Sequence, residues 1–310
     1  MNIITLGGVY IDIIGKQFPL PDFSRISKLN LELVGDGYRV EPGGSAVNFA
    51  RTCRTLGASS ICIGKTGQDI FSDILIRHLH EEGVVPHFLR DPDVQTNVSC
   101  NLSGDEHSLM LVMGSANQSL TGEEAEGQIK QVIAKDSILY LGGVLKMKKL
   151  YHRYESIIGS AKLKGAMVVL DHGRIHSGLI ESDIEFIRKL VSHVDVYLPS
   201  KEEFLEVWKA STIEDGLKSL AEMYPQLITI VKDGISGSVA LIGGHIYKQP
   251  IIPVTVISTI GAGDSYNAGF LTSFSEHHDV PLAMKFATAA AACRISRNDL
   301  PNRKDVSAML

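Results

Sequence analysis

The sequence predicts an α/β protein in which a mostly parallel sheet is flanked by helices and a few further strands form a small separate sheet. From about Ser119 onward, short apolar runs alternate with helical patterns, which is typical of βα units. Two earlier segments have strand patterns that do not fit this alternation. Because the 310 residues contain no linker-like stretch, we expect residues 1–310 to form one domain.

In the first third of the chain, strand and helix patterns already alternate, and glycines mark the expected helix ends. We predict strands over Asn2–Gly8 and Ser59–Gly64, and helices over Ser45–Leu56 and Asp69–Glu82.

The two exceptional segments are Leu29–Val40 and Thr96–Met113. The second has two strand-like runs around a Gly104-Asp105 turn, which is typical of a hairpin. We expect these strands, within residues 12–42 and 94–116, to form a small sheet that serves as a lid or a subunit contact.

The rest of the chain contains apolar runs short enough to be strands covered on both faces. They are Ser137–Leu141, Ala166–Leu170, Val194–Leu198 and Leu227–Val231. Two pairs, Thr121 with Glu124 and Ser182 with Glu185, have the spacing of a capping box and predict helix starts.

The composition excludes several classes of function. Lys and Arg number 30 against 35 Asp and Glu, a formal charge of −5 without a basic block, so we expect no nucleic-acid partner. No stretch reaches the ~18 apolar residues of a membrane span, and the first residues lack the pattern of a secretory signal. The four cysteines are widely spaced. We therefore expect a cytoplasmic protein without a disulfide framework or zinc cluster.

The strongest chemical signal is Ser258-Thr259-Ile260-Gly261-Ala262-Gly263-Asp264, which precedes a helical stretch from Ser265 to His277. Small residues at a helix start leave backbone N–H groups open to an anion such as phosphate. Asp264 lies where the helix dipole favours an ionised carboxylate, which is suited to act as a base. The pattern is equally typical of a glycine-rich turn with Asp264 as a simple N-cap.

A second glycine pair, Gly43 and Gly44, opens the helix that carries Asn48. Glycines allow a ligand close to the backbone, and the Asn48 amide can both donate to and accept from a polyol hydroxyl. Asp12 follows the first strand, at the edge where α/β sheets bind ligands, although an Asp at this place is also typical of a cap. A plain helix start explains the glycine pair as well.

Together these motifs resemble those of the ribokinase-like family of sugar and nucleoside kinases, also called the PfkB family. The order Gly-x-x-x-Asp, Gly-Gly-x-x-x-Asn and Gly-Ala-Gly-Asp covers nearly the whole chain. Three further segments are similar to family motifs: Gly64-Lys65-Thr66-Gly67-Gln68-Asp69, Gly114-Ser115-Ala116-Asn117 and Asp171-His172-Gly173-Arg174.

The resemblance implies roles for individual residues. Asp264 would be the catalytic base, and Gly261, Ala262 and Gly263 would form the anion hole. The acceptor would bind to Asp12, Gly43, Gly44, Asn48 and Arg174, and the nucleotide to Ser200, Lys232, Gly234, Gly237 and Thr288.

Two of these positions depart from the family pattern. Ser200 stands where the family has Asn in its Asn-x-x-Glu motif, whose Glu, here Glu203, organises Mg²⁺. Ser200 and Glu203 also have the spacing of a capping box, so the local sequence leaves both interpretations open. Lys232 stands where the family usually has Thr.

The resemblance implies an Mg²⁺- and ATP-dependent kinase that phosphorylates a hydroxyl of a sugar or sugar derivative. A nucleoside kinase is the alternative, and a non-catalytic ligand-binding relative is the rival from another class. Ser258 replaces the acidic residue that begins the family's anion-hole motif and contributes to a monovalent-cation site. We therefore expect weak or absent K⁺ dependence, and we expect a homodimer through the small sheet.

Overall fold

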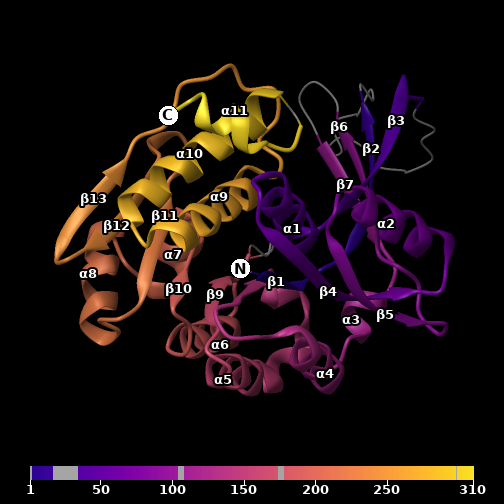
Figure 1. Cartoon of the computed structure of the whole chain (residues 1–310), viewed down its shortest axis with the longest axis horizontal. Helices are drawn as coiled ribbons and strands as arrows, with labels where there is room; N and C mark the ends of the chain where they lie inside the picture. Colours follow the sequence, from indigo (N-terminus) through magenta and orange to yellow (C-terminus); the bar gives the residue numbers. More distant parts are fainter. Residues whose placement is uncertain (1, 17–33, 104–107, 174–177, 298) are drawn as a thin grey trace, which may run out of the picture.

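The structure, a computed structural model, describes residues 2–16, 34–103, 108–173, 178–297 and 299–310. Within these residues the chain forms a large sheet with helices on both faces and a small sheet that projects from one side (Figure 1). The predicted fold class is confirmed.

The large sheet has the strand order β13-β12-β11-β10-β9-β8-β1-β4-β5. Strands from β11 to β5 pair in parallel, and β12 and β13 add an antiparallel edge. The bounds are β1 Asn2–Gly7, β4 Ser59–Gly67, β5 Val85–Asp91, β8 Ile138–Gly142, β9 Met167–Asp171, β10 Val196–Tyr197, β11 Ile228–Lys232, β12 Ser238–Ile242 and β13 His245–Gln249.

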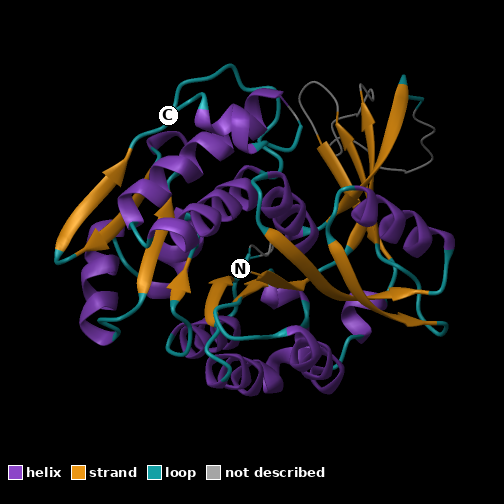
Figure 2. Cartoon of the chain, in the orientation of Figure 1, coloured by secondary structure: helices purple, strands orange, loops and turns teal. Residues whose placement is uncertain are grey.

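Helices cover both faces of this sheet (Figure 2), and the side chains of its strands alternate between two apolar cores, one on each face. Ile3 and Tyr140 point to the core with α1 Ser45–Thr55, α9 Ala262–His277, α10 Val280–Arg297 and α11 Arg303–Ser307. Ile4 and Leu141 point to the opposite core. That core is covered by α4 Gly122–Val132, α5 Tyr154–Leu163, α6 Glu181–Val191, α7 Lys201–Trp208 and α8 Ile213–Met223.

The small sheet has the order β3-β2-β6-β7. Its strands are β2 Tyr10–Lys16, β3 Gly37–Gly43, β6 Val98–Ser103 and β7 Ser108–Met113. β2 begins three residues after β1 ends, so the chain passes directly from the large sheet into the small one. Helix α2, Ile70–Glu81, shares a third apolar cluster with Ile11 of β2 and Cys62 of β4, which fastens the small sheet to the body.

The predicted strands and helices are present with shifts of a few residues, and the predicted hairpin is β6 and β7. Residues 29–33 of the predicted strand Leu29–Val40 lie outside the described residues, and β3 begins only at Gly37. The Gly104-Asp105 turn also lies outside them. Asp12 follows the first strand, as predicted, and it lies inside β2, opposite Glu41, because the chain resumes a strand after the Gly7-Gly8 break.

One capping box is confirmed and one is wrong. The Thr121 hydroxyl accepts from the Glu124 backbone N–H and the Glu124 carboxylate accepts from that of Thr121. α6 begins at Glu181 instead of after Ser182, because the Asp183 carboxylate accepts the backbone N–H of Ile180 and sets the helix start two residues earlier.

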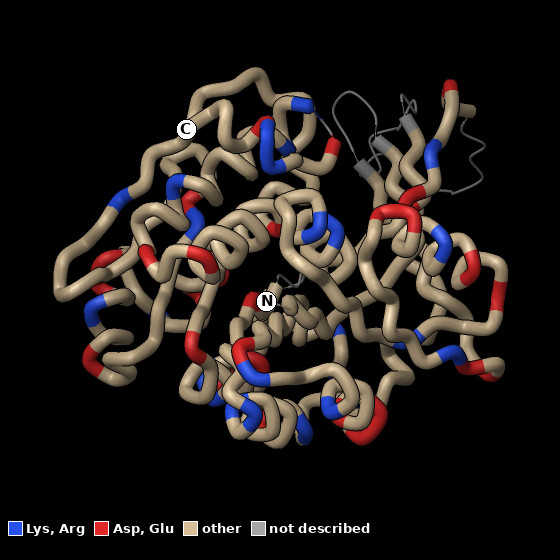
Figure 3. The backbone as a smooth tube through the Cα atoms, in the orientation of Figure 1, with Lys and Arg blue, Asp and Glu red and all other residues tan. Residues whose placement is uncertain are grey.

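None of the described helices has the length and apolar character needed to cross a membrane. Basic and acidic residues are interspersed over the described chain, so it presents no extended basic face in this view (Figure 3).

Helices α9 and α10 pack closely because α9 carries Gly269 at their contact. A Cβ atom built on Gly269 would lie 2.9 Å from both the Ala287 Cα and the Ala290 Cβ. Gly127 of α4 is also helical, but a Cβ there would meet no atom within 4 Å. A substitution at Gly269 therefore tests packing between helices, whereas the same substitution at Gly127 tests helix propensity alone.

We expect Gly269→Ala to lower the free energy of unfolding by ~1–3 kcal/mol, since the added methyl overpacks the contact between the two helices. Gly127→Ala should instead raise it by about 0.5–1 kcal/mol through helix propensity. Urea denaturation of both variants measures this. A Gly269→Ala protein as stable as Gly127→Ala would contradict the packing role.

Candidate active site

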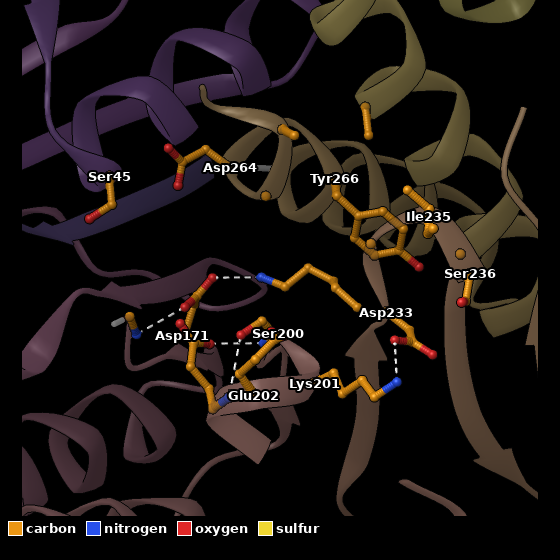
Figure 4. Close-up of a pocket in the computed structure, with 18 of the residues that line it drawn as sticks. Ser45, Asp171, Ser200, Lys201, Glu202, Asp233, Ile235, Ser236, Asp264 and Tyr266 are labelled. Carbon is orange, nitrogen blue, oxygen red and sulfur yellow. Dashed lines mark hydrogen bonds and ion pairs between the residues drawn. The ribbon is translucent and has the colours of Figure 1, made fainter. Parts of the chain in front are cut away.

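A cavity of about 780 Å³ opens at the carboxyl ends of the central strands, where α/β sheets bind ligands. Asp264 and Ser45 lie on one side of it and Asp171 and Ser200 on the other (Figure 4). Of the residues singled out from the sequence, it is lined by Ala262, Gly263, Asp264, Ser200, Glu203, Lys232, Gly234 and Gly237.

The backbone turn before α9 places Asp264 in the first turn of the helix. Gly261 is the N-cap with φ +77°, a left-handed conformation that favours glycine. The Nε atom of Arg294, near the end of α10, donates to the Ile260 carbonyl at 3.1 Å and holds this turn. The open N–H groups and the helix dipole make the turn suited to an anion.

The pKa of Asp264 is raised from its usual range to about 7, chiefly by burial and then by the charge of Asp171. Lys232 and a hydrogen bond from the Asn48 amide act in the opposite direction but are weaker. Burial thus opposes the helix dipole, and at a pKa of about 7 the Asp264 carboxyl group is only partly ionised at neutral pH. A carboxyl that titrates near pH 7 is well suited to general-base chemistry.

Asp171, at the end of β9, is the partner carboxylate of Asp264, and its pKa is lowered by Lys232 despite burial. The Lys232 Nζ atom donates to Asp171 Oδ2 at 2.9 Å and to Asn267 Oδ1 at 3.2 Å. The Asn267 amide also donates to Asp171 and, at 3.0 Å, to the Tyr140 hydroxyl. This network keeps Asp171 ionised next to the anion-binding turn.

Lys232 also reaches the anion-binding turn itself. Its Nζ atom lies 3.7 Å from the position of a Cβ atom on Gly263. A side chain at Gly263 would therefore contact the lysine, whereas glycine leaves space between the ammonium group and the open backbone of the turn. The Lys found in place of the family's Thr thus supplies a positive charge where an anion would bind.

The start of α1 lies beside the start of α9. Gly44 is the N-cap of α1 with φ +94°, and a Cβ there would lie 2.4 Å from the Gly8 carbonyl oxygen. The side chain of Asn48, in the first turn of α1, donates to Asp264. The two helix N-termini therefore converge on one carboxylate.

Asp12 lies against Gly43, where a Cβ atom would come within 2.1–2.4 Å of the Asp12 carboxyl group. The pKa of Asp12 is raised to about 6 by burial and by Glu41, while a hydrogen bond with Ser99 and the charges of Arg51 and Lys146 lower it. Asp12, Gly43 and Asn48 thus belong to the same side of the site.

Ser200 and Glu203 form the capping box of α7. The Glu203 Oε2 atom accepts the Ser200 backbone N–H at 2.8 Å, and the Ser200 hydroxyl accepts the Glu203 backbone N–H at 3.4 Å. Both residues also line the large cavity. The structural interpretation of this pair is therefore confirmed, and the Glu203 Oε1 atom remains available for a ligand role.

A second cavity, of about 320 Å³, adjoins the first and shares Gly234, Gly237 and Ala262 with it. Its other walls are mostly aliphatic, from the segment after β13 and from α10, and include Thr288. The Thr288 hydroxyl donates to the Met284 carbonyl at 2.9 Å. A flat apolar ring fits such a pocket, and the first cavity is suited to the charged groups attached to it.

The structure thus brings the predicted anion-hole, base and nucleotide residues together around the two cavities. The predicted acceptor residues Asp12, Gly43, Gly44 and Asn48 line neither cavity, although the Asn48 side chain reaches Asp264, and Arg174 lies outside the described residues. Asn267 and Arg294 were missed by sequence reasoning. Asn267 lies three residues after Asp264 and so shares its helix face, which is a signal the sequence contains. Arg294 had no signal, because its role depends on where α10 ends.

Comparisons with known proteins agree with this geometry. The model of the pfkB family carbohydrate kinases matches residues 6–302. The ribokinase of Bacillus subtilis is 23% identical over 318 residues, which cover 100% of this chain and 99% of that protein.

Two solved structures have a similar fold. A putative ribokinase II from E. coli in its apo form has a TM-score of 0.85 at 19% identity, covering 100% of this chain and 99% of that one. A putative ribokinase II from E. coli in complex with ATP and Mg²⁺ has a TM-score of 0.81 at 18% identity, covering 99% and 98%.

Proposed function

Because the chain belongs to the pfkB family of carbohydrate kinases, we propose that it transfers the γ-phosphoryl group of ATP to a hydroxyl of a sugar or sugar derivative. The observation that carries this proposal is the Asp264 carboxyl group, whose pKa is about 7, at the anion-binding start of α9. Each site role below belongs to this proposal.

Asp264 acts as the general base. Its carboxylate takes the proton from the acceptor hydroxyl while the acceptor oxygen forms a bond to the γ-phosphorus. The bond from that phosphorus to the β–γ bridging oxygen breaks, and ADP leaves. The Asn48 amide orients the carboxylate by its hydrogen bond.

The migrating phosphoryl group binds at the turn formed by Gly261, Ala262 and Gly263. Backbone N–H groups, the α9 dipole and the Lys232 ammonium group stabilise its charge in a position fixed before the reaction. The adenine ring occupies the aliphatic cavity beside Thr288, and the Gly234 and Gly237 turn lies between ring and phosphates.

The residues that line the large cavity fit an Mg²⁺ ion that is bound together with the nucleotide. Among the described residues no cluster of three or more carboxylate, histidine or cysteine side chains suits a metal by itself. Mg²⁺ typically binds one or two carboxylates, waters and substrate phosphates, and Glu203 lines the cavity to serve as one of them. Bound Mg²⁺ would neutralise phosphate charge. The proposal includes no activating K⁺, since Ser258 supplies no carboxylate.

Asp12 binds the acceptor by accepting hydrogen bonds from its hydroxyls, and the small sheet that carries Asp12 serves as the lid. Body and lid act as one domain in this proposal, because β1 passes directly into β2. All four cysteines are free, and Cys53, Cys62 and Cys293 are buried, which fits a reducing compartment such as the cytoplasm.

We expect Asp264→Asn to bind ATP and acceptor normally but to lower kcat by roughly 10²- to 10⁴-fold, because the base is lost. In the wild type, kcat/KM should rise with pH, reach half its maximum at about pH 7 and level off above that. The reason is that the pKa of Asp264 is raised to about 7 and only the ionised carboxylate accepts a proton. Mg-ATP-dependent ADP release, assayed from pH 5 to 9, measures both.

The acceptor panel for this assay contains neutral sugars, sugar acids, sugar phosphates and nucleosides. Phosphorylation of nucleosides alone would favour the nucleoside-kinase alternative. Binding without turnover of any acceptor would favour the non-catalytic relative. A folded Asp264→Asn protein with kcat within threefold of the wild type would contradict the role of Asp264.

Asp12→Ala should raise the KM of the acceptor about 5- to 150-fold, the equivalent of ~1–3 kcal/mol for hydroxyls left without their acceptor. The KM of ATP should stay unchanged. Asp93→Ala is the matched control. It removes an exposed carboxylate from the segment between β5 and β6 and should change neither KM. A raised KM for ATP with an unchanged KM for the acceptor would contradict the role of Asp12 in acceptor binding.

We propose a homodimer through β7, which is an edge strand of the small sheet. Leu111 and Met113 of β7 lie on the face that carries buried Ile11, yet they are 47% and 54% exposed. Exposed apolar side chains on an edge strand favour pairing with another chain. A second copy of this chain presents the same edge strand, so the two copies can pair through β7.

Light scattering at micromolar concentration should therefore give twice the mass of the 310-residue chain. Leu111→Lys should give the monomer mass. Leu163→Lys, at a distant site on α5 that is 90% exposed, is the control and should leave the dimer intact. A monomeric wild type, with and without acceptor, would remove this part of the proposal.

A further inference from the structure

A cavity of about 450 Å³, separate from the two already described, lies between the small sheet and the segment that follows β8. Three lysines of that segment line it: Lys146, Lys148 and Lys149. The remaining polar groups around it belong to Tyr10 and Gln118, and Val112 of β7 contributes an apolar wall.

The lysines are exposed because their neighbours anchor the segment. Leu145, Met147 and Leu150 are buried in the core under the large sheet. The backbone forms two 3-10 turns, Val144–Lys146 and Lys148–Arg153, and the Tyr151 hydroxyl donates to the Leu145 carbonyl at 3.1 Å. The three ammonium groups therefore project from a fixed backbone.

The polar lining of this cavity consists of hydrogen-bond donors. None of the residues that line it is an Asp or Glu, and no ion pair of the described residues involves the three lysines. The Gln118 Oε1 atom accepts from the Asn97 amide at 3.3 Å, which leaves its NH₂ group to donate. A lining that contains three lysines and no carboxylate suits an anion.

This cavity adjoins the acceptor residue Asp12. Tyr10 and Asp12 are two residues apart on β2 and so point to the same face of the small sheet. Asp12 pairs with Ser99, and Ser99 pairs with Val112, so that the wall residue Val112 lies in the same cross-strand row as Asp12. The charge of Lys146 acts on the Asp12 carboxylate directly.

We propose that the three lysines bind an anionic group of the acceptor, a phosphate or a carboxylate, so that the substrate is a sugar phosphate or sugar acid and not a neutral sugar. This inference rests on the proposed function. Asp12 holds the hydroxyl end of the acceptor toward Asp264, and the lysines hold its anionic end under the small sheet. Charge–charge attraction supplies the discrimination against neutral sugars.

The test measures binding by titration calorimetry without turnover, using fructose with fructose 6-phosphate and glucose with gluconate as matched neutral and anionic probes. The wild type should bind one or both anionic probes at least tenfold more tightly than the neutral counterpart, and the preferred probe distinguishes phosphate from carboxylate. Added salt should weaken only the anionic probe.

The variants are Lys146→Gln and the double variant Lys148→Gln with Lys149→Gln. Each should weaken binding of the anionic probe at least fivefold, and the double variant, which keeps Lys146 near Asp12, should leave the neutral probe unchanged. Lys164→Gln is the matched control, because Lys164 is an exposed lysine at the end of α5 outside this cavity.

The inference is overturned if neither anionic probe binds the wild type more tightly than its neutral counterpart, or if the lysine variants bind the anionic probe as the wild type does. A wild type that phosphorylates neutral sugars and none of the anionic acceptors would overturn it and leave the kinase proposal intact. Lysine-dependent anion binding without any phosphoryl transfer would support it and contradict the kinase proposal.

Discussion

The site depends on two neighbouring carboxylates, buried Asp171 and half-buried Asp264, only one of which is bonded to Lys232. Lys232 is bonded to Asp171 and not to Asp264, so Asp171 stays ionised while the pKa of Asp264 rises to about 7. Two like charges in a desolvated place raise the free-energy cost of ionising the carboxyl group that has no bonded cation. The environment thus assigns different chemistry to two side chains of the same type, and the proposed base follows from that asymmetry.

The backbone maintains this asymmetry through close approaches that other residues would not allow. The starts of α1 and α9 converge because Gly44 and Gly261 adopt left-handed conformations at the two N-caps. α10 lies close enough to α9, across Gly269, for Arg294 to hold the turn before Asp264. The packing of α10 against α9 therefore helps to fix the position of the Asp264 carboxyl group, the proposed proton acceptor.

Charged groups line both cavities that the proposed substrates would occupy. Lys232 and Asp264 line the large cavity, and the three lysines after β8 line the cavity beside β2 and β7. Gly143, at the start of the lysine segment, also lines the large cavity, so one connection contributes to both cavities. A substrate with negative charge at a distance from its reacting hydroxyl matches this arrangement.

The sequence alone determined the features that depend on neighbours within a few residues. Buried strands were visible as short apolar runs, and the Thr121 and Ser200 capping boxes were visible from their spacing. The motifs around Gly43, Gly44 and Asp264 indicated helix starts that bind a ligand, because open N–H groups are a local property. The small sheet was expected within residues 12–42, but no individual strand was predicted over β2, since the strands that pair with Asp12, at Glu41 and Ser99, lie elsewhere in the chain.

Only the tertiary structure decided the electrostatics. Asp171 and Lys232 are 61 residues apart, and nothing in either segment indicates that they pair. The pKa of Asp264 depends on desolvation by every element around it, which no local pattern contains. In the sequence, the lysines after β8 look like an ordinary solvent-exposed basic run. Only the fold shows that they line a cavity with residues of the small sheet. Hydrogen bonds along the chain are short-range and can be predicted from sequence, whereas burial and charge act through space and depend on the complete fold.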